Sequence, residues 1–129
     1  MMERGRLIGQ LIFLKSQYDP DPEDVDSKLF NRFDYELTHN EVAWIEMDGR
    51  IVAFCDWSWI SSLGDTAKVR KGEPTSGDIL FVISLVVTER NLLWPAKQLL
   101  PKHRWIAWKG KDGRIHTPKG IPHAEEAVA

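Results

Sequence analysis

Residues 79–87 read ILFVISLVV, the most apolar run in the chain and the stretch that decides its fold. Successive side chains of a strand point to opposite faces, so a strand with this sequence is apolar on both faces. Such a strand belongs in the middle of a sheet, and we expect residues 79–87 to lie there. A short helix is expected next, from Leu92 to Leu100, because Pro95 fits a first helical turn and Pro101 ends it.

Two Asp-Gly pairs predict hairpin turns on either side of this central run. Both residue types tolerate positive φ, which the tightest hairpin turns require. We therefore expect two hairpins in an antiparallel sheet. The turns and their flanking strands are Asp48-Gly49 between residues 41–47 and 51–59, and Asp112-Gly113 between residues 104–109 and 114–117.

The N-terminal part of the chain is expected to be helical. Apolar residues from Leu7 to Leu14 recur at helical spacing and predict a helix from Arg4 to Gln17. The prolines of residues 19–22 interrupt it. A second helix is expected where Val25, Leu29, Phe33 and Leu37 step by four, with Asp24 or Asp26 as its cap. Residues 61–77 are polar and contain Gly and Pro, which indicates a long loop.

Length and composition indicate one soluble domain. A chain of 129 residues fits a single domain, with a compact core at residues 1–117 and a loosely ordered tail at 118–129. The apolar residues near the N-terminus form too short a run to span a membrane. Cys55 is the only cysteine, so a reducing, cytoplasmic location is expected.

The charges are unevenly distributed along the chain. Ten acids and two bases lie between Asp19 and Asp48, whereas six bases and one acid lie between Lys102 and Lys119. The basic stretch could dock an anion, or both stretches could be solvated faces. The second interpretation is favoured, because single-sign stretches usually face water.

The order of helix, helix, hairpin, loop, central strand, helix and strand resembles the GNAT acyltransferase fold. That resemblance implies an α+β domain whose central, mostly antiparallel sheet has helices packed on it. Within that fold, residues 7–100 are similar to the toxin-activating lysine acyltransferases of RTX systems. Two motifs carry the likeness, Phe54-Cys55-Asp56-Trp57 and Thr75-Ser76-Gly77-Asp78. The resemblance implies transfer of an acyl group from acyl-CoA, or another acyl carrier, to an amine.

The residues depart from that family at its catalytic positions. The break at residues 17–26 contains no histidine, and Ser84 stands where the family has an aspartate. The resemblance places acyl-CoA against Val87 and Thr88, with its phosphates toward Arg90 and Asn91. The turn there has no glycine, and Glu89 would repel phosphate, so we expect weak binding.

Other residues of the chain are candidates for a base, a nucleophile or a metal ligand. Asp56 and Glu46 are weak candidates for a general base, since a carboxylate among apolar neighbours has a raised pKa. The favoured alternative for Asp56 is the wet face of its strand, and for Glu46 a surface charge. Cys55 is expected to be a packing residue. The four histidines have no metal-ligand spacing, so no metal is expected.

Trp105 and Trp108 lie among basic residues and differ by three positions. On a strand they face opposite ways, so one is expected at a surface, where it would anchor self-association or a protein partner. Stacking on nucleic acid is the less favoured alternative. Two functions therefore remain open, an acyltransferase and a catalytically inactive binding or structural module of the kind that phages could carry. The sequence does not name the acyl donor or acceptor, the partner or the oligomeric state.

Overall fold

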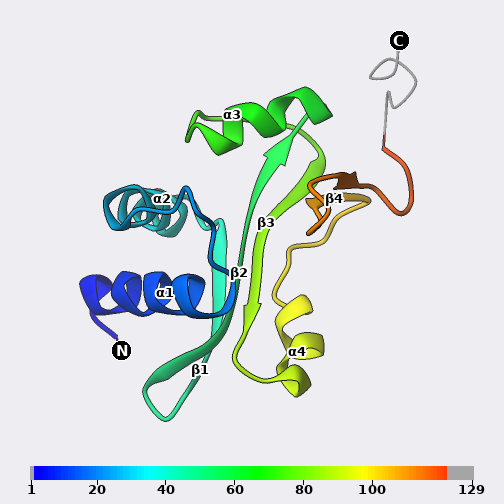
Figure 1. The fold of residues 1–129 in the computed structure, drawn as a ribbon. Coiled ribbons are helices and arrows are strands. Elements are labelled where there is room, and N and C mark those ends of the chain that lie inside the picture. Colours follow the sequence, from blue (N-terminus) through cyan, green and yellow to red (C-terminus); the bar gives the residue numbers. More distant parts are fainter. Residues whose placement is uncertain (1, 122–129) are drawn as a thin grey trace. The chain divides into compact units, whose positions relative to one another are not determined.

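The computed structural model describes residues 2–121, which contain a five-stranded sheet in the order β1-β2-β3-β4-β5 (Figure 1). The neighbours β1 and β2 are antiparallel, as are β4 and β5, whereas β3 and β4 are parallel. The chain divides into two compact units, unit 1 comprising Met1–Asp56 with Ser84–Leu100 and unit 2 comprising Trp57–Ile83 with Pro101–Ala129. The elements are α1 (Arg4–Tyr18), α2 (Asp26–His39), β1 (Val42–Met47), β2 (Arg50–Ile60), η1 (Leu63–Asp65), α3 (Thr66–Arg70), β3 (Ile79–Val87), η2 (Arg90–Leu92), α4 (Leu93–Lys97), β4 (Trp105–Lys109) and β5 (Ile115–His116).

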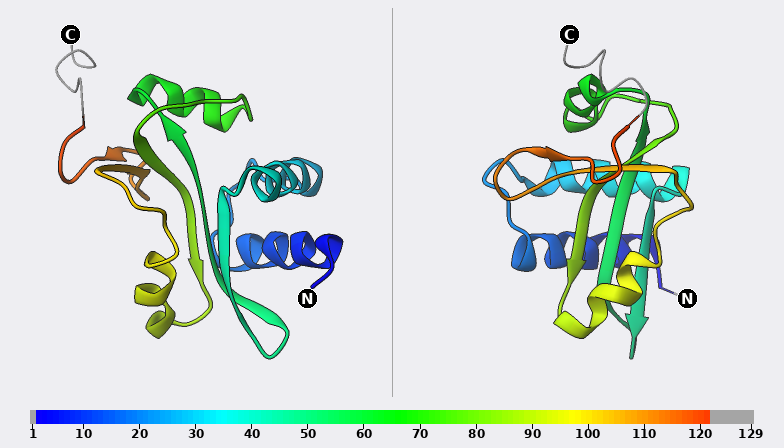
Figure 2. Two further views of the ribbon diagram at one scale, coloured as in Figure 1. Left: turned by 180° about the vertical axis from the view of Figure 1, so that it is seen from behind. Right: turned by 90° about the vertical axis from the view of Figure 1, so that its right-hand side faces the viewer.

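Unit 1 has its own core between the sheet and the first two helices. In both views α1 and α2 lie on one face of the strands of this unit, and α4 lies on the other face (Figure 2). The rings of Phe33 on α2 and Phe54 on β2 meet edge to face, with centroids 5.6 Å apart. The core residues are Leu7, Ile8, Leu11, Leu14, Leu29, Phe33, Val42, Ile51, Phe54 and Val86.

Unit 2 has a smaller core built on the other ends of β2 and β3. Ile60, Ile79, Phe81 and Ala107 form it, and all four are buried. The parallel register pairs Ile79 with Trp105 at one end and Val82 with Trp108 at the other. The strand expected from the sequence at residues 79–87 is therefore confirmed as the central strand of the five.

Both hairpins are present, with different turns. Asp48 and Gly49 both have positive φ, 53° and 76°, which is the two-residue turn that matches strand twist. In the second hairpin only Gly113 has positive φ, and the turn is longer, closed by a 2.8 Å bond from the Gly110 amide to the Arg114 carbonyl. Asp112 instead accepts a hydrogen bond from the Arg114 amide through its side chain.

The structure corrects three expectations about local elements. The segment at residues 61–77 is not a continuous loop, since η1 and α3 lie within it. The helix expected at Leu92–Leu100 begins earlier, as the 3-10 turn η2, and its α-helical part ends at Lys97. Neither Asp24 nor Asp26 caps α2, whose cap position is Val25 without a side-chain bond. Asp24 instead binds Lys15, and Val25 is exposed.

One glycine of unit 2 is required by a close approach of main chains. A Cβ atom built on Gly77 would lie 2.0 Å from the carbonyl oxygen of Ile60, and Gly77 has φ +154°. The chain entering β3 therefore passes against the end of β2 with no room for a side chain. Of the expected C-terminal tail, residues 118–121 form no helix or strand, and the rest lies outside the described residues.

Candidate functional site

A buried polar cluster lies between α2 and the strands of unit 1, formed by Arg32, Glu36, Asp56 and Ser84. The alternation of β2 that directs Phe54 into the core under α2 also directs Asp56 to that face. Asp56 and Ser84 are buried, and so is Glu36. The expectation that Asp56 lies on a wet face of its strand was therefore wrong, because α2 covers that face.

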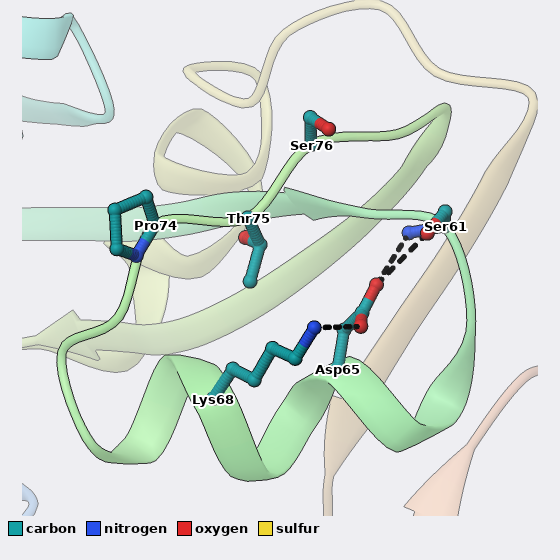
Figure 3. Close-up of a pocket in the computed structure, with 6 residues that line it drawn as sticks. All are labelled: Ser61, Asp65, Lys68, Pro74, Thr75 and Ser76. Carbon is teal, nitrogen blue, oxygen red and sulfur yellow. Dashed lines mark hydrogen bonds and ion pairs between the residues drawn. The ribbon is translucent and has the colours of Figure 1, made fainter.

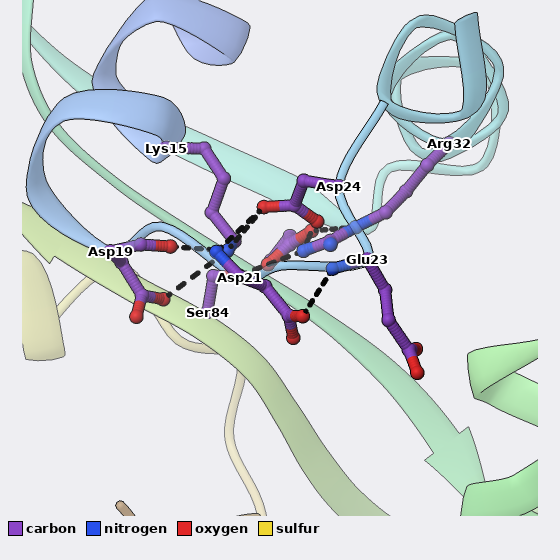
Figure 4. Close-up of polar contacts among 8 residues, drawn as sticks. Lys15, Asp19, Asp21, Glu23, Asp24, Arg32 and Ser84 are labelled. Carbon is purple, nitrogen blue, oxygen red and sulfur yellow. Dashed lines mark hydrogen bonds and ion pairs between the residues drawn. The ribbon is translucent and has the colours of Figure 1, made fainter. Parts of the chain in front are cut away.

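Arg32 holds this cluster together through its guanidinium. Its Nε donates to Asp56 Oδ2 at 2.8 Å, and its Nη2 donates to the same oxygen. Nη2 also donates to Ser84 Oγ at 2.8 Å (Figure 4). Nε also lies 3.4 Å from Glu36 Oε2, one helical turn away. Burial works against the charge of Arg32, but the charges of Asp56 and Glu36 outweigh it and raise the pKa of Arg32.

Two carboxyl groups share this single cation. Burial raises the pKa of Glu36 well above its usual value, and the charge of Asp56 and a hydrogen bond with it add to the effect. Within residues 2–121, Glu36 Oε1 and Asp56 Oδ1 are buried side-chain oxygens without a donor when both groups are ionised. A proton on Glu36 therefore supplies the missing donor and leaves the cluster electrically balanced.

A second polar group lies beside this cluster, after α1. The ammonium group of Lys15 is almost fully buried and donates to Asp24 Oδ2 at 3.0 Å and to the carbonyl of Asp19. Figure 4 shows Ser84 in the same close-up as Lys15, Asp19 and Asp24. The break after α1 and the Ser84 position both make polar contacts within unit 1, through Lys15 and Arg32 respectively.

The residues expected to hold acyl-CoA gather at the other end of β3. Val87 ends the strand, and Thr88 donates its amide to the Val52 carbonyl at 3.0 Å, so this amide is already used by the sheet. Arg90 and Asn91 are exposed and open η2, so their amides have no acceptor within that turn. Since the helical segment is shorter than expected, its dipole adds less than a full helix would.

The part of β3 that belongs to unit 1, residues 84–87, is an edge strand of that unit. The parallel register with β4 stops at Val82, and in unit 1 the strand order ends at β3. The residues from Ser84 to Val87 thus keep one main-chain edge without a strand partner in the described part of unit 1. An extended chain with amide groups can bind such an edge.

The remaining candidates lie apart from this strand end. Glu46 is exposed on β1 beside a bulge in the register. Cys55 faces α4, with Sγ 3.9 Å from the Ala96 carbonyl, and burial together with the charge of Asp56 raises its pKa to about 12. A thiol with that pKa is protonated near neutral pH, and the protonated form is a poor nucleophile. Within residues 2–121 no three His, Cys, Asp or Glu side chains are grouped to hold a metal.

A shallow polar hollow of about 330 Å³ lies in unit 2, lined by Ser61, Asp65, Lys68, Pro74, Thr75 and Ser76 (Figure 3). Asp65 accepts hydrogen bonds from the Ser61 amide and hydroxyl at 3.1 and 2.9 Å, which lower its pKa, and its other oxygen lies 3.6 Å from Lys68. Through these hydrogen bonds Asp65 connects η1 to Ser61, the residue that follows β2. The polar contacts of Asp65 in this hollow therefore have a structural role.

Sequence reasoning missed Arg32, Glu36 and Lys15. The signals were present, since Arg32 and Glu36 are one turn apart on α2 and Lys15 lies beside the apolar stripe of α1. Nothing in the sequence alone indicated that Asp56, four residues before the end of β2, was their partner.

Comparison with known proteins supports the fold and little more. No family model matches the chain, and no curated protein matches it. Among solved structures, it is similar to the GphF GNAT-like decarboxylase in complex with isobutyryl-CoA, with a TM-score of 0.56 and 16% identity, over 82% of this chain. The chain spans 62% of the length of that protein.

A second solved structure is similar over the whole chain. It is the loading GNATL domain of CurA from Lyngbya majuscula, with a TM-score of 0.60 and 11% identity, and the chain covers 72% of it. Identities this low establish the architecture alone. The chain therefore has a GNAT-like α+β fold, as the order of its elements predicted.

Proposed function

We propose that this chain binds an acyl-CoA at the end of β3 and transfers its acyl group to an amine. The observation that supports this best is the combination of Arg90 beyond the strand end with the open edge of residues 84–87. The diphosphate would meet Arg90 and the amides of η2, and the amide-containing pantetheine arm would lie along the strand edge.

The length of this edge sets where the thioester would reach. Ser84 and Val87 are three positions apart on the strand, a span of roughly 10 Å at the rise of an extended chain. A pantetheine arm that starts at Arg90 and follows this edge brings the thioester toward Ser84 and the Arg32 cluster. There the amine nitrogen would attack the carbonyl carbon, the C–S bond would break, and the proton lost by the amine would end on the departing thiol.

Neither Asp56 nor Glu46, the two candidates for a general base, is well placed for this step. Asp56 is fully buried and paired with Arg32, and Glu46 belongs to the β1–β2 hairpin. The likeness to the toxin-activating lysine acyltransferases remains a hypothesis, because the catalytic histidine and aspartate of that family have no counterparts here. The donor could be acyl-CoA or another acyl carrier, and we expect a cytoplasmic setting, where such thioesters occur.

The proposal is tested by calorimetric titration with isobutyryl-CoA, acetyl-CoA and free CoA at low salt. Glu89→Gln should tighten binding about threefold by removing a repulsive charge, and Arg90→Ala should weaken it by a similar factor. Asp26→Asn and Lys28→Ala are matched controls in unit 1, since both side chains are exposed at the start of α2 and not at the end of β3. If even the Glu89→Gln protein binds no acyl-CoA, the proposal is wrong.

A second candidate function is a binding module without catalysis. The observation in its favour is α4, where Trp94 is 71% exposed and Leu93 is exposed beside it. Adjacent exposed apolar side chains can form part of a protein contact, and tryptophan is enriched among the residues that anchor such contacts. Release of free CoA thiol on addition of amines separates the two candidates, because a module that binds acyl-CoA without turnover releases none.

A further inference from the structure

The two compact units carry opposite net charges. Unit 1 contains thirteen acids and eight bases, a net charge of −5. The described part of unit 2, residues 57–83 and 101–121, contains four acids and nine bases, a net charge of +5. The sequence showed uneven stretches, but the fold collects them into one acidic and one basic unit.

The basic charge of unit 2 is concentrated on an exposed surface, here called the basic hairpin. It comprises the six exposed bases on β4, its turn and its flanks: Lys102, Arg104, Lys109, Lys111, Arg114 and Lys119. Within residues 2–121 none of these six forms an ion pair. Asp112, the one acid among them, already binds the Arg114 amide and His116. The basic hairpin is thus available to an acidic partner.

Unit 1 offers a surface of the complementary kind, here called the acidic elbow. It is the connection from α1 to α2 together with the first residue of α2, and its acids Asp21, Glu23 and Asp26 are exposed. Apolar side chains accompany the acids, with Tyr18, Val25 and Phe30 between 46% and 52% exposed. Protein interfaces combine charged groups with apolar surface, because burial of the apolar surface contributes affinity and the charges fix the orientation of the partners.

We propose that the partner of the basic hairpin is a second copy of this chain, which presents its acidic elbow. The contact joins two different surfaces, so it is head to tail and each copy can bind one neighbour on each side. It does not depend on acyl-CoA binding. The tryptophans of the hairpin support a protein contact more than base stacking, because Arg104 covers one face of Trp105 at 4.6 Å and His116 stacks on Trp108 at 5.8 Å.

Sedimentation velocity at 50 and 500 mM NaCl tests this proposal over a range of concentrations. We expect association that weakens by about tenfold or more at the higher salt, since screening acts on exposed charges. Lys109→Glu with Lys111→Glu should weaken it by a similar factor, and so should Glu23→Lys with Asp26→Lys. The control, Lys28→Glu with Arg50→Glu, changes net charge as the hairpin variant does but makes unit 1 more acidic, and it should not weaken association.

Mixing the two weakened variants gives the decisive result. The hairpin variant retains an intact acidic elbow, and the elbow variant retains an intact basic hairpin, so together they should form a 1:1 complex that neither forms alone. Circular dichroism establishes that both variants are folded. A wild-type chain that is monomeric at 50 mM NaCl, or a mixture that fails to associate, overturns the proposal. Tight binding of single-stranded DNA by a monomeric chain would overturn it in favour of a nucleic-acid surface.

Discussion

The buried charges of unit 1 illustrate how a single residue can depend on partners that are remote in sequence. Asp56 sits between Cys55 and Trp57 in an apolar strand, and its position alone left open a wet face or a buried one. The deciding residue, Arg32, lies 24 positions away. Strand alternation predicted correctly that Asp56 shares a face with Phe54, but only the packing of α2 shows that this face is buried.

Glu36 makes stability depend on pH in a predictable direction. Its pKa is raised in the folded state, so the folded chain binds a proton that the unfolded chain releases above about pH 4.5. The stabilisation is complete below the unfolded pKa and is lost as pH rises toward the folded one, by up to about 1.4 kcal/mol per pH unit. In Glu36→Gln this loss should vanish, because the amide can donate to Asp56 at any pH.

Urea unfolding of the wild type and Glu36→Gln between pH 4.5 and 8 measures this effect. The difference between the two proteins should grow with pH in favour of the variant. Glu46→Gln, which changes an exposed carboxylate of β1, should show no such trend. A constant difference across the range would show that Glu36 is ionised in the folded chain.

Removing Arg32 should be costly because it leaves Asp56 buried without its counterion. Arg32→Ala is expected to lower the free energy of unfolding by about 3 kcal/mol, at the low end for a broken buried pair because the guanidinium is partly exposed. Arg4→Ala breaks the exposed pair with Asp34 and should cost less than about 1 kcal/mol. Equal costs in denaturant unfolding would mean that the buried pair is no stronger than the surface one.

At the scale of elements, the sequence predicted those with strong local signals. Helix α1, both hairpins and β3 were expected within a residue or two, since apolar spacing and Asp-Gly turns are local properties. The cap of α2 and the helices inside residues 61–77 were not, because both depend on contacts made after folding. Lys15 donates a hydrogen bond to Asp24, and Ser61 donates one to Asp65. Neither contact produces a repeating pattern of apolar residues in the sequence.

The first hairpin provides a direct test of an element. Gly49→Val places a β-branched side chain at φ 76° and should cost about 1–3 kcal/mol. Gly9→Val is the matched control, because that glycine lies in α1 with nothing within 4 Å of an added Cβ. Thermal unfolding should show the larger loss for Gly49→Val, and the reverse order would contradict the turn assignment.

At the scale of the whole molecule, the two units share their strands. Both β2 and β3 pass from one unit to the other, so we expect the chain to unfold in one cooperative transition. Sequence analysis predicted a single domain from length alone. The sequence predicted the acidic and the basic stretch, but not the bounds of the units that contain them, because residues 84–100 join unit 1 only through folding.

Val82→Asp tests the shared strands, since Val82 is a buried residue of β3 in unit 2. Burying an unpaired carboxylate should cost several kcal/mol, about 3 or more. The melting curves of the variant recorded by tryptophan fluorescence and by far-ultraviolet circular dichroism should coincide, and both should move to lower temperature than in the wild type. Val25→Asp adds the same group at the exposed cap of α2 and should be neutral or stabilising. Two separate transitions would show that the units are independent domains.

The close passage of Gly77 against Ile60 has a consequence for saturation mutagenesis. Every other amino acid places a Cβ where the Ile60 carbonyl already lies, so each should be depleted under any selection that requires a folded chain. A display screen for folding and a screen for acyl transfer should therefore give the same profile at Gly77. At Arg90 the profiles should diverge, because this exposed side chain has no packing role. Depletion at position 77 thus measures the requirement for folding in each screen, and depletion at Arg90 beyond that level in the acyl-transfer screen reports a requirement for function.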